Sequence, residues 1–390
     1  MNLLQHILVI DFSQFLSGPS ASLRLADMGA EVIKIEKPGN GDICRQLYVS
    51  DIFIEGESTI FHAINRNKKS YAADLKDADD LEKIKLLLAK ADVMMHNFRP
   101  GVMKRLGLDY ETVKKINPSI IYAEISGYGS EGPWKDLPGQ DLLLQSATGL
   151  TWLSNNSDEN PTPMGVAVVD IMAGTHIAQG ILAMLYKRTI NGEGALLQVN
   201  MFESALDFQF EVLTCYYNDG NQLPVRSAIN SGHAYIAAPY GIYKTKDDYI
   251  ALAMTDIIRL GVLLQCEPLK QFSNASDWFD KRDEIKKILA THLLKEIAGY
   301  WLAILEKADI WCAPVLNYDK LVKEEGYRVL NMEITVKTSN GLSVKTTRCP
   351  IRVDGKLLVS DKGAPLLGEH NEEIDAQFGL PKELQPVIKR

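Results

Sequence analysis

The chain has 390 residues, of which 46% are hydrophobic and 24% charged, and its formal net charge is −8. A chain of this length can bury more than one hydrophobic core, so we expect more than one domain. The acidic balance, without a long basic run, argues against a nucleic-acid partner. The five cysteines are scattered and form no CxxC pair, so we expect neither a disulfide framework nor a metal site.

The first residues are apolar but lack the basic flank and cleavage site of a signal peptide. No stretch approaches the roughly 18 apolar residues that a membrane span requires. We therefore expect a reduced, cytoplasmic protein with no membrane partner.

Strands and helices alternate through the first third of the chain. Apolar, β-branched runs predict strands, and apolar residues at helical spacing predict helices between them. The predicted strands are 6–11, 31–36, 70–75, 92–98 and 119–129, and the predicted helices are 20–30, 77–91 and 110–118. This alternation predicts an open, mostly parallel, Rossmann-like α/β sheet. Ligands of such sheets bind at the carboxyl ends of the strands, which here are the loops FLSGP, IEKPGNGD, HNFRPG and SGYGSEGP.

The rest of the chain begins with a long predicted helix over 171–190, followed by a strand and another helix. Near 218–234 the composition changes to NDGNQLPVRSAINSGH, which is typical of a linker. A hairpin around Lys246–Asp248, helices to about 307 and a strand-like piece come next. Alternating strands with Gly341 and Gly355 at turns then span 333–359.

The segment GVAVVDIMAG, 165–174, carries one acid, Asp170, between a strand-like run and a helix. Aspartate is a favoured helix N-cap, and on spacing alone that role is favoured over catalysis. The two roles are compatible. A helix N-terminus stabilises the anion, and a carboxylate ionised at pH 7 needs no base to act as a nucleophile.

Three further patterns have ordinary explanations beside functional ones. The segment 15–36 imitates a dinucleotide site, but its turn has one glycine instead of GxGxxG, and Pro19 removes an N–H that pyrophosphate binding would use. His96, His176 and His233 are isolated, so structural histidines are favoured over ligands. Basic residues near the strand ends are mostly surface charges, but as a set they suggest a phosphate-rich ligand: Lys34, Lys37, Arg45, Lys68, Lys69, Arg99, Lys104 and Arg105.

Taken together, several segments resemble one family nearly from end to end: VIDFSQFLSGPSASLRLADMGAEVIKIEKPGNGD, NRNKKSYAADLK, HNFRPGVMKRLGLDYE, ISGYGSEGPW, PGQDLLLQSATGL, GVAVVDIMAG and GAPLLGEHNEEI. The chain is similar to the class III CoA-transferases, a group that includes formyl-CoA transferase, carnitine CoA-transferase and 2-methylacyl-CoA racemase. The resemblance implies a large α/β domain over 1–217, a linker and smaller α+β domain over 218–325, and a C-terminal return to the large domain over 326–390. It also implies an interlocked homodimer.

The resemblance implies that Asp170 is the nucleophile of a CoA-transferase, forming an aspartyl anhydride and then an aspartyl-CoA thioester. The expected partners are acyl-CoA and carboxylic acid substrates. Coenzyme A enters as part of the substrate, and no tightly bound cofactor is expected. The positions implied to contact CoA are Leu16, Ser17, Lys37, Asn97, Phe98, Arg99 and Arg105, with Arg105 on a phosphate.

Two departures from the family pattern refine the expected reaction. The racemase branch has an acid/base histidine where this chain has Gln140, which has no titratable proton, so transfer is favoured over racemisation. We expect Gln140 to be a polar group of the acyl site. The glycine run of the formyl-CoA-type enzymes is replaced by NSGHAYIAAPYG, 230–241, which argues against formyl or oxalyl specificity and leaves His233 without an assigned role. An acyl-CoA racemase and a non-catalytic CoA-binding protein remain the alternatives.

Overall fold

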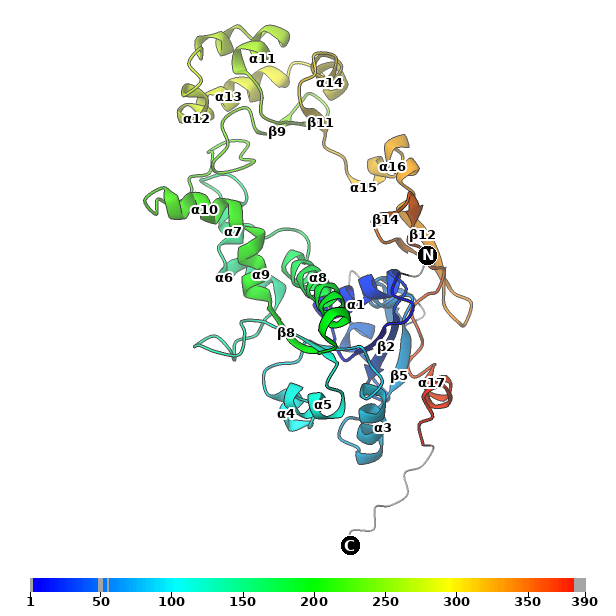
Figure 1. The fold of residues 1–390 in the computed structure, drawn as a ribbon. Helices are drawn as coiled ribbons and strands as arrows, with labels where there is room; N and C mark the ends of the chain where they lie inside the picture. Colours follow the sequence, from blue (N-terminus) through cyan, green and yellow to red (C-terminus); the bar gives the residue numbers. More distant parts are fainter. Residues whose placement is uncertain (1–2, 48–51, 55, 382–390) are drawn as a thin grey trace. The chain divides into compact units, whose positions relative to one another are not determined.

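The computed structural model describes residues 3–47, 52–54 and 56–381 (Figure 1). Its central element is a six-stranded sheet in the order β5-β2-β1-β6-β7-β8, in which every pairing is parallel. This confirms the predicted open α/β sheet. The strands are β1 (Leu8–Asp11), β2 (Glu31–Glu36), β5 (Lys69–Ala72), β6 (Val93–His96), β7 (Ile121–Ser126) and β8 (Ala195–Asn200).

Successive residues of each strand point to opposite faces of the sheet, and each face buries its own apolar cluster. Val9, Val93 and Ile121 face α1 (Ser17–Asp27), α8 (Val168–Asn191) and α9 (Met201–Phe208). Ile10, Met94 and Tyr122 face the other layer, which is formed by α3 (Ala78–Leu88), α4 (Val102–Arg105), α5 (Tyr110–Ile116) and α17 (Asn371–Phe378). The two layers explain why the strands are apolar in consecutive positions.

Smaller elements lie between these strands in chain order. They are η1 (Ile43–Arg45), β3 (Phe53–Ile54), β4 (Glu57–Ser58), α2 (Thr59–Asn65), α6 (Asp141–Ala147) and α7 (Leu150–Leu153). The predicted strands of 333–359 are confirmed as two antiparallel pairs. The first is β12 (Glu333–Lys337) with β13 (Ser343–Thr347), and the second is β14 (Arg352–Val353) with β15 (Lys356–Leu357).

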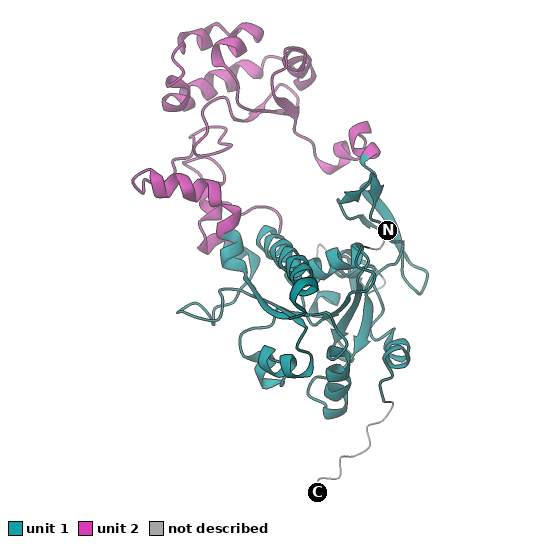
Figure 2. Ribbon diagram, in the orientation of Figure 1, with its two compact units in different colours: residues 1–144, 167–205, 330–390 teal, residues 145–166, 206–329 magenta. Residues whose placement is uncertain are grey.

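Contacts divide the chain into two compact units (Figure 2). The first holds residues 1–144, 167–205 and 330–390 and contains the six-stranded sheet; the second holds 145–166 and 206–329. The predicted domain boundaries at 217/218 and 325/326 were drawn from the linker composition and the family resemblance, and they stay a prediction.

The second unit has its own core around a three-stranded antiparallel sheet in the order β11-β10-β9. The predicted hairpin around Lys246–Asp248 is confirmed, since β9 (Gly241–Lys244) pairs with β10 (Tyr249–Leu252). β11 (Cys312–Pro314) adds to the other edge of β10. The helices are α10 (Phe210–Asn218), α11 (Ile257–Leu263), η2 (Glu267–Gln271), α12 (Asp277–Asp280), α13 (Arg282–Leu293), α14 (Ala298–Lys307), α15 (Tyr318–Leu321) and α16 (Glu325–Leu330).

Helix α8 corrects one expectation. With 24 residues it is long and apolar enough, by length and composition, to cross a membrane, although no such stretch was expected from the sequence. Its Ala173, Ile177 and Ile181 are fully buried in the cluster that covers the sheet. One apolar helix of this length is weak evidence for a membrane span, because a core helix passes the same test of length and composition.

Candidate active site

Asp170 lies in the first turn of α8, but it is not the residue that caps the helix. The helix begins at Val168, and the N-cap is Ala167, whose side chain makes no capping hydrogen bond. The prediction that Asp170 is the N-cap is therefore wrong. Asp141 takes that role from a distant part of the chain, because its Oδ2 accepts hydrogen bonds from the N–H groups of Val169 at 2.8 Å and Asp170 at 3.0 Å. These are two of the first-turn amides that a helix leaves without an internal partner.

Two glycines bring Asp141 to α8. Gly127 follows β7, Gly139 precedes Gln140 and Asp141, and their backbones pack against each other. A Cβ added to Gly139 would lie 2.5 Å from the Gly127 Cα atom, which real Cβ contacts essentially never show. The motifs SGYG and PGQD therefore have a structural reason for their glycines. They let two backbones meet so that Asp141 reaches the start of α8.

A second helix N-terminus also reaches Asp170. The Ser17 side chain and backbone both form hydrogen bonds with the Asp170 carboxylate. Ser17 is the first residue of α1, which starts earlier than the predicted 20–30 because Gly18 and Pro19 belong to its first turn instead of a loop. Proline is tolerated there because first-turn N–H groups have no helical partner. Helix α8 approaches α1 closely at Gly174, where a Cβ would lie 2.7 Å from the Ser17 carbonyl oxygen.

These surroundings raise the pKa of Asp170 to about 6. Burial is the largest cause, the nearby Asp141 carboxylate adds to it, and the hydrogen bonds from Ser17 oppose it. The helix N-terminus was expected to stabilise the anion, but the pKa is raised because burial and the Asp141 charge favour the protonated form more strongly. At pH 7 the ionised form still outnumbers the protonated form by about ten to one, so Asp170 remains a nucleophile without a base.

The loop between β1 and α1 carries Ser17, and side chains from neighbouring strands hold it. The Asn97 amide donates to the Gln14 carbonyl at 2.6 Å and to the Ser17 hydroxyl at 3.3 Å. Its oxygen accepts the Gln14 N–H at 2.8 Å. The Lys34 ammonium donates to the Ser13 carbonyl at 2.7 Å. Asn97 thus acts on the Ser17 hydroxyl directly and on the loop backbone before it.

Buried ion pairs lie beneath this loop. Lys34 is fully buried and pairs with Asp42 at 2.7 Å, and Lys68 lies 3.6 Å from Asp11. Burial lowers the pKa of Lys68 to about 7. Arg45 pairs with Glu36 at 2.7 Å. These three belong to the set of eight cations that suggested a phosphate-rich ligand, but they are neither surface charges nor free for a phosphate, because they lie beside carboxylates inside the protein. Lys34 and Lys68 hold the loop and the start of α1 instead, through the Ser13 and Pro19 carbonyl oxygens.

A cavity of about 590 Å³ gathers three of the residues implied to contact CoA. Lys37 and Arg105 are exposed at this cavity, and Phe98 lines it. Its walls are otherwise mostly apolar, with Phe12, Ile35, Ala73, Leu75, Val102 and Leu106. Lys76 also lines it and was missed in the sequence, where nothing distinguishes it from a surface lysine. Two lysines and an arginine beside an apolar wall suit a ligand that combines phosphate with an aromatic ring.

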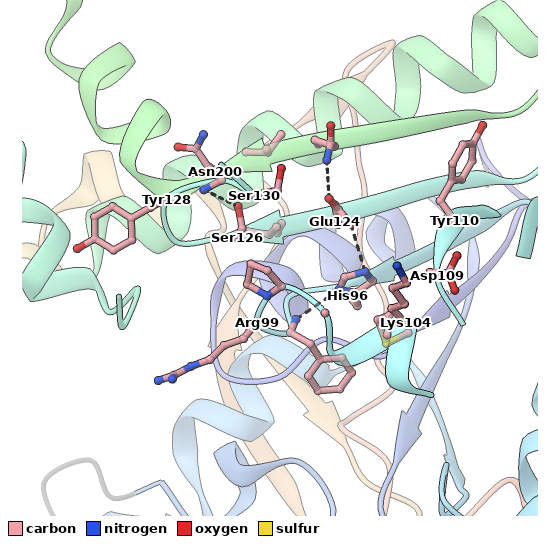
Figure 3. A pocket seen from close by; sticks show the side chains of 18 of the residues that line it. His96, Arg99, Lys104, Asp109, Tyr110, Glu124, Ser126, Tyr128, Ser130 and Asn200 are labelled. Atoms are coloured by element: carbon pink, nitrogen blue, oxygen red, sulfur yellow. Dashed lines mark hydrogen bonds and ion pairs between the residues drawn. The ribbon is translucent and has the colours of Figure 1, made fainter. Parts of the chain in front are cut away.

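Arg99 lines a different cavity, of about 700 Å³, at the ends of β6, β7 and β8 (Figure 3). Its side chain extends away from the labelled residues of β7. On the floor, His96 is buried and lies 3.1 Å from the Tyr122 hydroxyl. Burial lowers the pKa of His96 to about 4, so this ring is neutral at pH 7. His96 is thus the structural histidine that the sequence favoured, and Arg99 is not grouped with Lys37 and Arg105.

The other predicted residues have distinct places. Leu16 is the N-cap of α1 and packs against a small cluster that includes Cys44 and Phe61. Gln140 is exposed and directly precedes Asp141. In the second unit, the Nδ1 of His233 accepts the Tyr235 N–H at 3.1 Å. Within residues 3–47, 52–54 and 56–381, no group of three His, Cys, Asp or Glu side chains could hold a metal ion.

Comparisons with known proteins agree with the resemblance. Residues 4–371 match CoA-transferase family III. The chain is 33% identical to acetyl-CoA:oxalate CoA-transferase of Acetobacter aceti, and the match covers 96% of both chains. It is 31% identical to succinyl-CoA:glutarate CoA-transferase of Mus musculus, over 96% of this chain and 86% of that one. The solved structure of a CAIB/BAIF family protein from Brucella suis is 29% identical, with a TM-score of 0.83 over 95% of this chain and 98% of that one. The chain therefore belongs to CoA-transferase family III.

Proposed function

We propose that this protein transfers coenzyme A from an acyl-CoA thioester to a carboxylic acid, with Asp170 as the nucleophile. The observation that carries this proposal is the position of Asp170 in the first turn of α8, where it is partly buried and held by Ser17. Membership of a family whose relatives are named CoA-transferases supports the reaction class.

The reaction proceeds through two covalent states of Asp170. One carboxylate oxygen attacks the thioester carbonyl carbon, the carbon–sulfur bond breaks, and CoA leaves as a thiolate from a mixed anhydride. The thiolate then attacks the Asp170 carbonyl carbon, which releases the donor carboxylate and leaves an aspartyl-CoA thioester. The acceptor carboxylate carries out both steps in reverse order and leaves with the CoA. Because every step is an acyl substitution by a carboxylate or a thiolate, with no change of oxidation state, we propose no tightly bound cofactor.

Each attack creates a tetrahedral oxyanion that needs hydrogen-bond donors fixed in advance. We assign this role to the start of α1, since the Ser17 side chain and backbone already bind the free carboxylate there. Water must be excluded while the anhydride exists, because hydrolysis would lose the energy of the thioester. Burial of Asp170 contributes to this exclusion.

We assign the nucleotide part of CoA to the cavity lined by Lys37, Lys76, Phe98 and Arg105. The basic side chains suit its phosphates, and the apolar wall suits its adenine ring. Leu16, Ser17 and Asn97 would then contact the part of CoA that runs from this cavity toward Asp170, while Arg99 remains a proposed contact from the neighbouring loop.

We also propose the homodimer that the resemblance implies. The exposed side of α8 supports it, since Ile171, Tyr186 and Ile190 are 45%, 71% and 72% exposed. Large exposed apolar side chains on one helix are compatible with a protein–protein contact. Light scattering on the purified protein gives the mass that tests it. A cytoplasmic location stays a prediction from the scattered cysteines.

The relatives' names help to choose substrates, because they include oxalate, glutarate and mesaconate, all dicarboxylates. We therefore propose small dicarboxylic acids as the first acceptors to examine. Nothing favours the racemase alternative, since Gln140 has no titratable proton.

The test is exchange of an isotopic label between acyl-CoA and its free acid, followed by a panel of dicarboxylic acceptors. We expect exchange in the native protein and none in Asp170→Asn, while Asp77→Asn, a substitution at the exposed cap of α3, remains active. Full exchange in Asp170→Asn would overturn the proposal. Tight CoA binding without any exchange would favour the non-catalytic alternative.

A further inference from the structure

Helix α8 carries the proposed nucleophile but does not cap its own N-terminus. Ala167 has no side-chain acceptor, and Asp141 accepts the hydrogen bonds of the Val169 and Asp170 amides instead. One carboxylate therefore holds the backbone of the residue whose own carboxylate is proposed to react. An N-cap ordinarily lies next to its helix in the chain, whereas this one is 28 residues before Val169.

The arrangement is built by the fold and does not depend on a flexible side chain. The close backbone contact of Gly127 with Gly139 fixes the segment that leads into Asp141. Asp141 itself is partly buried and begins α6. Even alanine at either glycine position would push this segment away from β7. Asp141 would then move away from the start of α8.

The charge of Asp141 also acts on Asp170. Asp141 raises the pKa of Asp170, and the hydrogen bonds from Ser17 of α1 lower it. The charge of Asp170 in turn raises the pKa of the Cys44 thiol in η1. The pKa of Cys44 is raised to about 12, so this thiol is neutral at pH 7. Lys34, Lys68 and Asp42 lie behind Cys44 and interact with its thiol. Asp141 is thus the charged group with the largest effect on Asp170 among the described residues.

We propose that Asp141 is a positioning residue for Asp170: its carboxylate caps α8 in place of an N-cap side chain, and its negative charge makes the Asp170 carboxylate a stronger nucleophile. This inference rests on the proposed function for its kinetic consequence only. Asp141 forms no covalent bond and transfers no proton. It fixes the backbone of Asp170 through the amide hydrogen bonds, and its negative charge repels the negative charge of the Asp170 carboxylate.

The test separates the cap from the charge. Asp141→Asn keeps an oxygen that can accept the two amide hydrogen bonds but removes the charge, and Asp141→Ala removes both. Asp77→Asn is the matched control, since Asp77 caps α3 by accepting the N–H groups of Asp79 and Asp80 at 2.9 and 3.1 Å. Circular dichroism first establishes that each variant is folded.

The first readout does not require activity. Carbodiimide reacts with protonated carboxyl groups, so labelling of the Asp170 peptide, followed by mass spectrometry across pH, reports the titration of Asp170. We expect its midpoint near pH 6 in the native protein and in Asp77→Asn. We expect a lower midpoint in Asp141→Asn, because the Asp141 charge is one of the causes that raise the pKa of Asp170. An unchanged midpoint in Asp141→Asn would overturn the role of the charge.

The second readout is steady-state transfer. A displaced nucleophile costs up to about 100-fold in rate, so we expect kcat to fall by about 10- to 100-fold in Asp141→Ala and by less in Asp141→Asn, with KM for acyl-CoA little changed. Equal kcat in both variants and the native protein would overturn the role of the cap. If Asp170→Asn proved fully active, the proposed function would fail, but the shift of the labelling midpoint would still test the interaction of the two carboxylates.

Discussion

Gly174→Ala tests whether the close approach of α8 to α1 positions Asp170. The new Cβ would lie 2.4 Å from the Ser20 hydroxyl oxygen and 2.7 Å from the Ser17 carbonyl oxygen. The hydroxyl can rotate away, but the carbonyl belongs to the backbone of the first turn of α1. Ordinary contact begins near 3.4 Å, so the two helices must separate by about 0.7 Å.

That displacement acts on the hydrogen bonds between Ser17 and Asp170, because both residues lie within one turn of the contact. A misplacement of this size costs on the order of 10- to 100-fold in rate. Helix propensity acts in the opposite direction, since alanine is about 1 kcal/mol better than glycine inside a helix. We therefore expect a large loss of kcat with little loss of thermal stability.

The assay is steady-state transfer with circular dichroism melting, and the control is Gly180→Ala on the same helix. A Cβ there would meet only the Leu197 side chain, at 2.8 Å, and a side-chain end can move. We expect Gly180→Ala to retain most activity. If Gly174→Ala has the native kcat and KM, close packing of α8 on α1 is not what orients Asp170.

Three further predictions follow from the site. Because the pKa of Asp170 is raised to about 6 and attack requires the anion, kcat/KM for a thioester donor should fall tenfold per pH unit below pH 6 and be flat above it; a flat profile down to pH 5 would refute the assignment. Lys34→Met breaks a fully buried ion pair and should lower the free energy of unfolding by about 3–5 kcal/mol. Denaturant unfolding measures this loss. The control is Lys69→Met, which breaks a partly exposed pair and should cost under about 1 kcal/mol. Arg105→Ala should raise KM for acyl-CoA about tenfold, with Lys104→Ala as control, and an unchanged KM would remove Arg105 from the phosphates of CoA.

Much of the sheet could be predicted because its signal is local. Strands buried on both faces are apolar in consecutive positions, and the helices between them have a periodic apolar face. The errors lie at helix starts. Helix α1 begins at Ser17 and α8 at Val168, in both cases before the predicted residue, because the groups that satisfy their first-turn amides do not follow the usual capping sequence.

Site residues that belong to a recognisable motif could be predicted from the sequence. A residue whose role depends on contacts between segments distant in the sequence could not. Ser17 and Asn97 were named from the resemblance and meet beside Asp170. Asp141 was missed because its role depends on the backbone contact between Gly127 and Gly139, which are far from α8 in the sequence. Lys34 was counted among the cations near the strand ends because a lysine is ordinarily exposed, whereas here it is buried and paired with Asp42.

The most direct test of the central claim is to trap the acylated nucleophile. The protein is incubated with acyl-CoA and hydroxylamine, and the peptide that contains Asp170 is analysed by mass spectrometry. We expect a hydroxamate on Asp170, formed when hydroxylamine intercepts the anhydride or the thioester. A protein that exchanges label between acyl-CoA and free acid, yet leaves Asp170 unmodified while another residue carries the hydroxamate, would contradict it.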